Sequence, residues 1–225
     1  MKERPITLKP WEARALVAGT QTQIRRVVSP EPDRRAEWLR ADLNEVWRAG
    51  AAAGEVPELG SWRCPYGAQG HQLWGRESWQ FYDWTEDGDP CIRFAADNAI
   101  LWPRIRSEGD AVRLTEIWAG LSGAENYSID NFARDRRWRP AIHMPRWASR
   151  IVLEVADLRV ERLQAISETD AIAESCSGGH GSIKGYPYNA TPREHFQSRW
   201  ERTYGPGAWS DNPWVWCISV RRTAS

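Results

Sequence analysis

The sequence predicts an α+β fold, with strands at both ends and in the middle of the chain and helices between them. Short apolar or alternating segments at 4–8, 149–155 and 214–220 predict the strands. Capping residues followed by helix-forming stretches predict the helices. The 225 residues are 41% hydrophobic and 27% charged, which is typical of a globular protein. We therefore expect one domain that spans residues 1–225.

The first elements are a strand, a helix and a second strand. Residues 4–8 predict the strand, and Pro10 begins the helix because a missing N–H costs least in the first turn. Gly19 is a natural C-terminal cap for this helix. The second half of residues 20–28 alternates polar and β-branched side chains, which predicts the second strand.

Three further stretches lie before the middle of the chain. Residues 33–53 predict a helix, because their large apolar residues recur at helical spacing. Residues 54–72 are rich in Gly and Pro and predict a loop. Residues 71–79 alternate as in a barrel strand. One face of that strand would carry Leu73, Gly75, Glu77 and Trp79.

A long insertion is predicted at about residues 80–137, which are aromatic, charged and irregular. Within it, residues 91–94 predict a strand, and Asp87-Gly88 before them is a hairpin turn signal. Residues 138–148 contain two prolines and predict an ordered loop rather than a regular helix.

The last third predicts two strands and two capped helices. Residues 149–155, continued by 158–163, predict the clearest strand, and residues 214–220 predict the closing one. Ser167 caps a helix that runs to about residue 175, with Asp170 as the capping-box carboxylate.

A flexible loop at 176–190 separates the two helices. Thr191, Pro192 and Glu194 then predict the start of the second helix, and the glycines at 205–207 predict its end.

The formal net charge is zero. A protein that binds nucleic acid mainly through phosphates normally carries a positive surplus. Contacts with nucleic acid therefore need local arginine clusters, or the ligand is small. The run at 134–139 places Trp138 among arginines, which suits single-stranded nucleic acid, although such runs are more often a solvated face.

No metal or cofactor is predicted. The four cysteines are scattered without metal-ligand spacing, and we expect free thiols in a reducing compartment: Cys64, Cys91, Cys176 and Cys217. The first residues lack the apolar core of a signal peptide, and no apolar run approaches the length of a membrane span. We expect a cytoplasmic protein that does not contact membranes.

Four segments together resemble the ASCH domain of many phage and prophage proteins. They are residues 18–28, 64–79 and 138–155, and the pair 167–175 with 212–220. The resemblance implies a PUA-like fold, which is a small β-barrel (a pseudo-barrel) flanked by helices, with the long insertion within it. It also implies a cleft between the first helix and the barrel, and a phage- or prophage-encoded protein of a bacterial host cell.

The resemblance further implies what the cleft binds: a nucleobase, a nucleotide or single-stranded nucleic acid, with a modified base among the options. Small enzymes of the family hydrolyse N4-acetylcytidine there with a Lys, a Thr and a Glu. Here Gln21 and Ile24 stand at the Lys and Thr positions, and only Glu77 matches. Gln cannot accept a proton at neutral pH and Ile has no hydroxyl.

Binding is therefore the leading hypothesis, and whether the protein is an enzyme stays open. One alternative is a hydrolase, either an N4-acetylcytidine amidohydrolase or a nuclease, with Glu77 as the catalytic base. Another is a protein-interaction role in phage assembly or host interference, through an apolar patch on the insertion.

Nine side chains are candidates for binding the ligand: Gln21, Thr22, Gln23, Arg25, Arg26, Arg76, Trp79, His143 and Arg146. Amide side chains can read base edges, and an arginine can meet a phosphate or pair with Glu77. Trp79 can stack a base or belong to the core. His143 and Arg146 can form the lip of the cleft, although a structural hydrogen bond is an equally simple role for His143.

Overall fold

The computed structural model describes residues 2–32, 36, 38–41, 46–50, 61–84, 90–101 and 137–223. Contacts between residues divide the chain into two compact units. Unit 1 comprises residues 1–4, 15–73 and 153–224, and unit 2 comprises residues 5–14 and 74–152.

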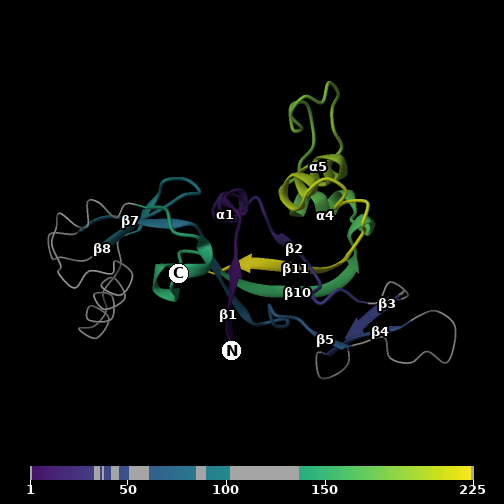
Figure 1. Ribbon diagram of the computed structural model, residues 1–225, viewed down its shortest axis with the longest axis horizontal. Coiled ribbons are helices and arrows are strands. Elements are labelled where there is room, and N and C mark those ends of the chain that lie inside the picture. Colours follow the sequence, from purple (N-terminus) through teal and green to yellow (C-terminus); the bar gives the residue numbers. More distant parts are fainter. Residues whose placement is uncertain are drawn as a thin grey trace. The chain divides into compact units, whose positions relative to one another are not determined.

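The architecture is mixed α+β, as predicted, with most of the described strands in three sheets (Figure 1). The largest sheet has the order β1-β6-β10-β11-β2. Its strands are β1 (Glu3–Thr7), β2 (Gln23–Val27), β6 (Gln72–Arg76), β10 (Val152–Arg162) and β11 (Trp214–Arg222). Within the described residues this sheet is open, with β1 and β2 at its edges, so it forms no closed barrel.

The strand predictions for the first and last parts of the chain are confirmed, and so is the first helix. The helix α1 (Pro10–Val17) begins at Pro10, and Gly19 follows it with φ of 73°. In unit 1, β11 pairs antiparallel with both β10 and β2.

The helix predicted at 33–53 is wrong. The described residues there form the strands β3 (Trp38–Ala41) and β4 (Val46–Gly50), which pair antiparallel, and β5 (Ser61–Arg63) adds to β4. Trp47 is buried, lies opposite Trp62 across the strands, and makes an edge contact with Trp216 at 5.5 Å. These contacts between distant aromatic residues favour the sheet over the local helix propensity.

The single strand predicted at 71–79 is also divided. The strand β6 ends at Arg76, and β7 (Trp79–Trp84) begins a separate sheet in the order β7-β8-β9, with β8 (Pro90–Phe94) and β9 (Ile100–Leu101). The strand predicted at 91–94 is thus confirmed, whereas the predicted Asp87-Gly88 turn lies outside the described residues. A Cβ at Gly75 would lie 2.7 Å from Leu8 Cδ1 and 3.1 Å from Ile151 Cβ, so a larger residue here would displace the Leu8 side chain.

The core of unit 2 is aromatic. Buried residues of β7, β8 and the segment 141–148 pack together: Trp79, Phe81, Ile92, Phe94, Met144 and Ala148. As predicted, the proline-bounded segment is an ordered loop, and it contains the two short turns η1 (Ala141–His143) and η2 (Arg146–Ala148).

Two capped helices cover the sheet of unit 1. In α4 (Glu168–Ala173), Ser167 accepts a hydrogen bond from the Asp170 amide as the N-cap. In α5 (Pro192–Tyr204), Thr191 and Glu194 form the predicted capping box, and Gly205 ends the helix. None of the described helices is long and apolar enough to cross a membrane.

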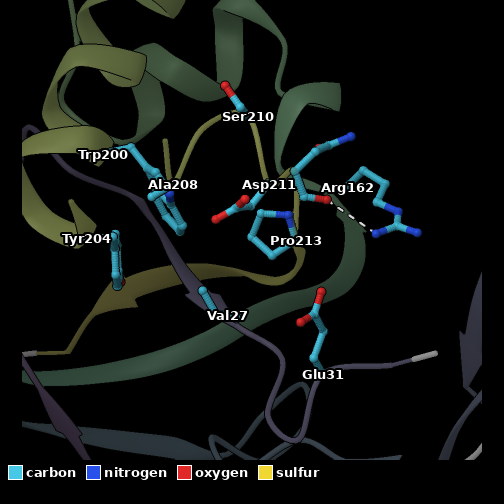
Figure 2. Close-up of a pocket in the computed structure, with 10 residues that line it drawn as sticks. Val27, Glu31, Arg162, Trp200, Tyr204, Ala208, Ser210, Asp211 and Pro213 are labelled. Atoms are coloured by element: carbon cyan, nitrogen blue, oxygen red, sulfur yellow. Dashed lines mark hydrogen bonds between the residues drawn. The ribbon is translucent and has the colours of Figure 1, made fainter. Parts of the chain in front are cut away.

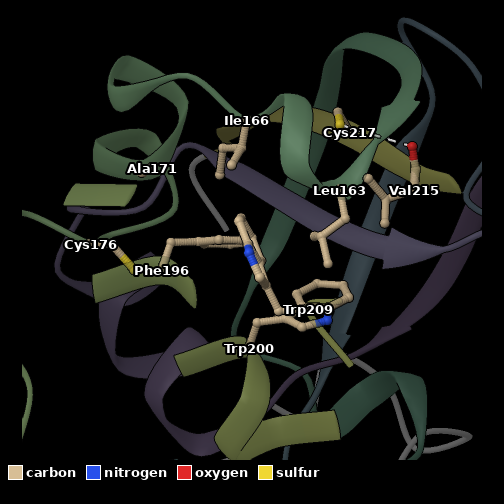
Figure 3. Close-up of a cluster of buried hydrophobic side chains, with 9 residues drawn as sticks. All are labelled: Leu163, Ile166, Ala171, Cys176, Phe196, Trp200, Trp209, Val215 and Cys217. Carbon is tan, nitrogen blue, oxygen red and sulfur yellow. Dashed lines mark hydrogen bonds between the residues drawn. The ribbon is translucent and has the colours of Figure 1, made fainter. Parts of the chain in front are cut away.

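A buried cluster fastens both helices to β11 (Figure 3). Its members are Leu163, Ile166, Ala171, Cys176, Phe196, Trp200, Trp209, Val215 and Cys217. Fully burying a large apolar side chain stabilises the fold by about 1.5–3 kcal/mol. The cluster therefore fixes α5, whose last turn borders the cavity described below.

The glycine at 178 tests how tightly the start of α5 is packed. We expect Gly178→Ala to lower the free energy of unfolding more than Gly185→Ala. Both residues have φ above 60°, which costs roughly 1–2 kcal/mol for alanine. Only at Gly178 would the new Cβ meet backbone, at 2.5 Å from the Ala190 oxygen. Urea denaturation measures the difference, and equal destabilisation by the two variants would contradict it.

Candidate functional site

The ten candidate residues fall into two groups. Unit 1 contains Gln21, Thr22, Gln23, Arg25 and Arg26, and unit 2 contains Arg76, Glu77, Trp79, His143 and Arg146.

Arg25 of β2 is the centre of a buried ion network in unit 1. Its side chain is 0% exposed. Its guanidinium contacts Glu161 Oε1 at 2.6 Å, Glu174 Oε1 at 3.1 Å and Asp170 Oδ2 at 3.3 Å, and donates to Gln23 Oε1. Burial alone lowers the pKa of Arg25, but its neighbours raise that pKa above the ordinary value. Arg25 is therefore a permanent buried charge, compensated by three carboxylates.

The same network attaches α4 to the strands. Asp170 in the first turn of α4 pairs with Arg159 of β10 at 2.8 Å and accepts from Gln23 Nε2 at 3.2 Å. The Thr22 amide donates to the Ala173 carbonyl at 2.9 Å. Burial by itself raises the pKa of Asp170, but Arg159, Arg25 and Gln23 together outweigh it and lower the pKa. Gln23 and Arg25 thus serve the packing of α4.

Gln21 is different, because its acceptor lacks a partner. Its Nε2 donates to the Gln23 carbonyl at 2.8 Å, and the residue is only 3% exposed. Within the described part of the chain, Gln21 Oε1 has no hydrogen-bond partner. Its neighbour Thr22 is exposed, and Arg26 Nη1 donates to the Arg25 carbonyl at 2.9 Å.

Glu77 in unit 2 is held by Arg150. Arg150 donates to both carboxylate oxygens, at 2.9 Å from Nε and 2.7 Å from Nη2, and Glu77 is 2% exposed. Arg150 also pairs with Asp97 at 2.9 Å and lies over the Phe94 ring at 4.0 Å. Sequence reasoning missed Arg150, because it lies 73 residues from Glu77 and no local pattern marks it.

The other candidates of unit 2 do not converge on one point. Trp79 is 0% exposed and belongs to the core. Arg76 lies over the Trp74 ring at 4.7 Å, with Arg146 at 6.0 Å from the same ring. His143 is exposed.

A cavity of about 640 Å³ lies in unit 1, beside the end of α5 (Figure 2). It is lined by Val27, Glu31, Arg162, Trp200, Tyr204, Ala208, Ser210, Asp211, Asn212 and Pro213. None of these residues was among the sequence candidates. They come from four separate segments, and no motif links them.

One wall of the cavity is aromatic. The ring of Tyr204 lies 4.2 Å from that of Trp200, tilted by 35°, and Tyr204 is 43% exposed. Trp200 is 5% exposed, and in the described residues its indole Nε1 has no hydrogen-bond acceptor. The cavity therefore offers an exposed tyrosine ring, whereas the indole N–H of Trp200 is fully buried behind it.

The polar side of the cavity is acidic. The carboxylates of Glu31 and Asp211, both exposed, project toward it from opposite sides (Figure 2). The Arg162 guanidinium turns away, donating to the Asn212 carbonyl at 3.3 Å and stacking on Trp214 at 4.4 Å. Burial lowers the pKa of Arg162 more than the nearby Glu31 carboxylate raises it, and this side of the cavity carries two carboxylates and one guanidinium.

Across the described ranges, no group of three His, Cys, Asp or Glu side chains could hold a metal ion. All four cysteines are buried free thiols.

Removing the buried guanidinium of Arg25 should destabilise unit 1 strongly. We expect Arg25→Gln to lower the free energy of unfolding by about 3–5 kcal/mol, because it removes the buried cation that contacts all three carboxylates. Urea denaturation measures the loss. The control Arg221→Gln removes a guanidinium that is 73% exposed and lies 4.0 Å from the carboxylate of Glu154. It should change the free energy of unfolding little. A small loss for Arg25→Gln would show that the network is not structural.

The depressed pKa of Asp170 predicts the acid dependence of stability. A carboxylate whose folded pKa lies below its unfolded value stabilises the fold above the unfolded pKa, and this contribution is lost as pH falls through the folded value. We expect wild-type stability to fall below about pH 4 and the fall to be shallower in Asp170→Asn. Thermal unfolding of both proteins at a series of pH values above and below about pH 4 measures this pH dependence. Asp157→Asn, at an exposed site of β10, should keep the wild-type slope.

No protein-family model, curated protein or solved structure matches this chain. Its function is therefore argued from its own side chains.

Proposed function

We propose that this protein binds a nucleobase, carried by a nucleoside or by single-stranded nucleic acid, in the cavity beside α5. The observation that carries the proposal is the open ring of Tyr204 beside two carboxylates in a space of about 640 Å³. Small-molecule sites commonly measure 300–1,000 Å³ and combine an apolar wall with a few polar groups.

The aromatic wall suits the face of a base. Tyr204 is backed by Trp200, which keeps its ring in place, and its open surface can stack on any base. Stacking of a base on an aromatic side chain contributes about 1–3 kcal/mol.

The polar groups suit the edge of a base. Carboxylates accept hydrogen bonds from amino groups such as N4 of cytosine. Glu31 and Asp211 also repel a phosphate, so the base rather than the phosphate would hold the ligand in place.

The resemblance to ASCH domains supports the same class of ligand, and we propose membership of that family and a PUA-like fold together. The cleft implied by the resemblance would contain Gln21, whose buried, unpartnered oxygen would have to become exposed before it accepted a hydrogen bond from an amino group. Gln21 is therefore the second place where a base can bind, and the experiment below separates the two.

Hydrolysis by Glu77 has less support than binding. Both oxygens of its carboxylate accept from Arg150 at 2.9 Å and 2.7 Å, and the residue is 2% exposed, so a general base here would need both a broken ion pair and a path for water. A protein-interaction role was predicted from the insertion, and residues 102–136 of the insertion lie outside the described part of the chain.

Nucleoside titrations test the proposal. We expect cytidine to bind more tightly than uridine, because uridine lacks the exocyclic amino group. Asp211→Asn should weaken cytidine binding about tenfold, since one good base-edge contact contributes about 1–3 kcal/mol. Isothermal titration calorimetry measures both.

Two variants complete that experiment. Asp157→Asn changes an exposed aspartate of the same unit and should leave cytidine affinity unchanged. If Gln21→Met weakened cytidine binding and Asp211→Asn did not, the base would bind at Gln21 and not in the cavity beside α5. If the wild type binds neither a nucleoside nor a single strand, the proposed function is wrong.

A further inference from the structure

We infer that the loop at residues 177–190 is a second contact for single-stranded nucleic acid, so that the cavity receives one base of a strand. This inference rests on the proposed function. The loop is called the tyrosine loop below, after its two tyrosines.

The tyrosine loop is closed at its base. The Gly179 amide donates to the Ala190 carbonyl at 2.7 Å, and the reverse bond measures 3.3 Å. A Cβ at Gly178 would lie 2.5 Å from the same Ala190 oxygen, so the two ends of the loop are in close contact. In Figure 1 the loop extends away from α4 and α5.

One tyrosine fixes the loop to α5 and the other is presented to solvent. The Tyr186 hydroxyl donates to Glu194 Oε1 at 3.2 Å, in the first turn of α5. Tyr188 is 71% exposed and meets the Tyr186 ring edge-on at 6.0 Å. An aromatic ring that is this open and supported by a second ring is a stacking platform for a base.

The charge of the loop suits a phosphate backbone. Lys184 is exposed, and residues 176–190 include no aspartate or glutamate. A lysine beside a stacked base can neutralise a phosphate. This combination favours nucleic acid over a protein partner, although an exposed tyrosine alone would suit both.

The helix α5 connects the loop and the cavity. Tyr186 is bonded to its first turn, and Trp200 and Tyr204 lie in its last turns. Thirteen helical residues span about 20 Å. A stacked single strand covers that distance with about six nucleotides. A free nucleoside can fill only the cavity, whereas a longer strand can reach both places.

The experiment compares cytidine with a 12-nucleotide oligocytidine, as DNA and as RNA. We expect the wild type to bind the oligonucleotide at least tenfold more tightly than cytidine. Tyr188→Ala should weaken oligonucleotide binding about fivefold or more and leave cytidine binding unchanged, because only the strand reaches the loop. Tyr188→Phe keeps the ring and should keep the affinity. Calorimetry measures cytidine, and fluorescence anisotropy measures the labelled strands.

Two further variants identify the surface. Trp138→Ala removes a ring of unit 2 that is 46% exposed and should leave oligonucleotide binding unchanged. Lys184→Ala should lower the slope of log affinity against log salt by about 1. A loss with Trp138→Ala in place of Tyr188→Ala would overturn the inference, because the strand would then cross the basic run at 134–139.

The outcomes separate the inference from the proposed function. If cytidine binds and the oligonucleotide binds no more tightly, the tyrosine loop is not a contact and the proposed function stands. If the oligonucleotide binds more tightly but Tyr188→Ala has no effect, the inference is again wrong. If neither ligand binds, the proposed function itself fails.

Discussion

The buried guanidinium of Arg25 is the constraint on which unit 1 depends. A charge removed from water must be compensated nearby, and here the compensation comes from Glu161 of β10 and from Asp170 and Glu174, at the two ends of α4. That requirement places α4 against the strands. The helix in turn contributes Ala171 to the cluster that holds Trp200. Since Trp200 is a wall of the cavity, the ion network and the candidate binding site are mechanically connected.

The need to compensate a buried charge also explains why a charged residue at an expected catalytic position need not be reactive. Glu77 stands where a catalytic carboxylate would be expected, yet Arg150 occupies both of its oxygens and also pairs with Asp97. Removing Arg150 would leave the carboxylate of Glu77 buried without the cation that compensates its charge. Reactivity requires a group that is open to a ligand. In the described residues of unit 1, the exposed carboxylates beside Tyr204 meet that requirement better than the buried candidates do.

Local rules predicted the elements whose causes are local. Helix caps act within one turn of a helix, and the structure confirms the predicted ones at Ser167, Thr191 and Gly205. The helix expected at 33–53 failed because Trp47 packs on Trp216, far away in the sequence. The cavity was missed for the same reason, since its lining residues come from separate segments and no spacing rule relates them. Composition did limit the mode of binding, because a chain of zero net charge gains little from phosphates alone.

In the proposed site, the acidic side of the cavity would disfavour bases without an amino group as much as it would favour bases that have one. A base with an amino group would replace the water that solvates Asp211 and Glu31, and it would donate hydrogen bonds to these carboxylates in return. A base without that group would displace the same water and return fewer hydrogen bonds, which leaves polar groups unpaired at a cost of about 1–3 kcal/mol each. Stacking on Tyr204 is nearly equal for all bases, so it cannot discriminate among them. In the proposed site, discrimination among bases would therefore come from the carboxylates, and any preference for longer strands from a contact outside the cavity.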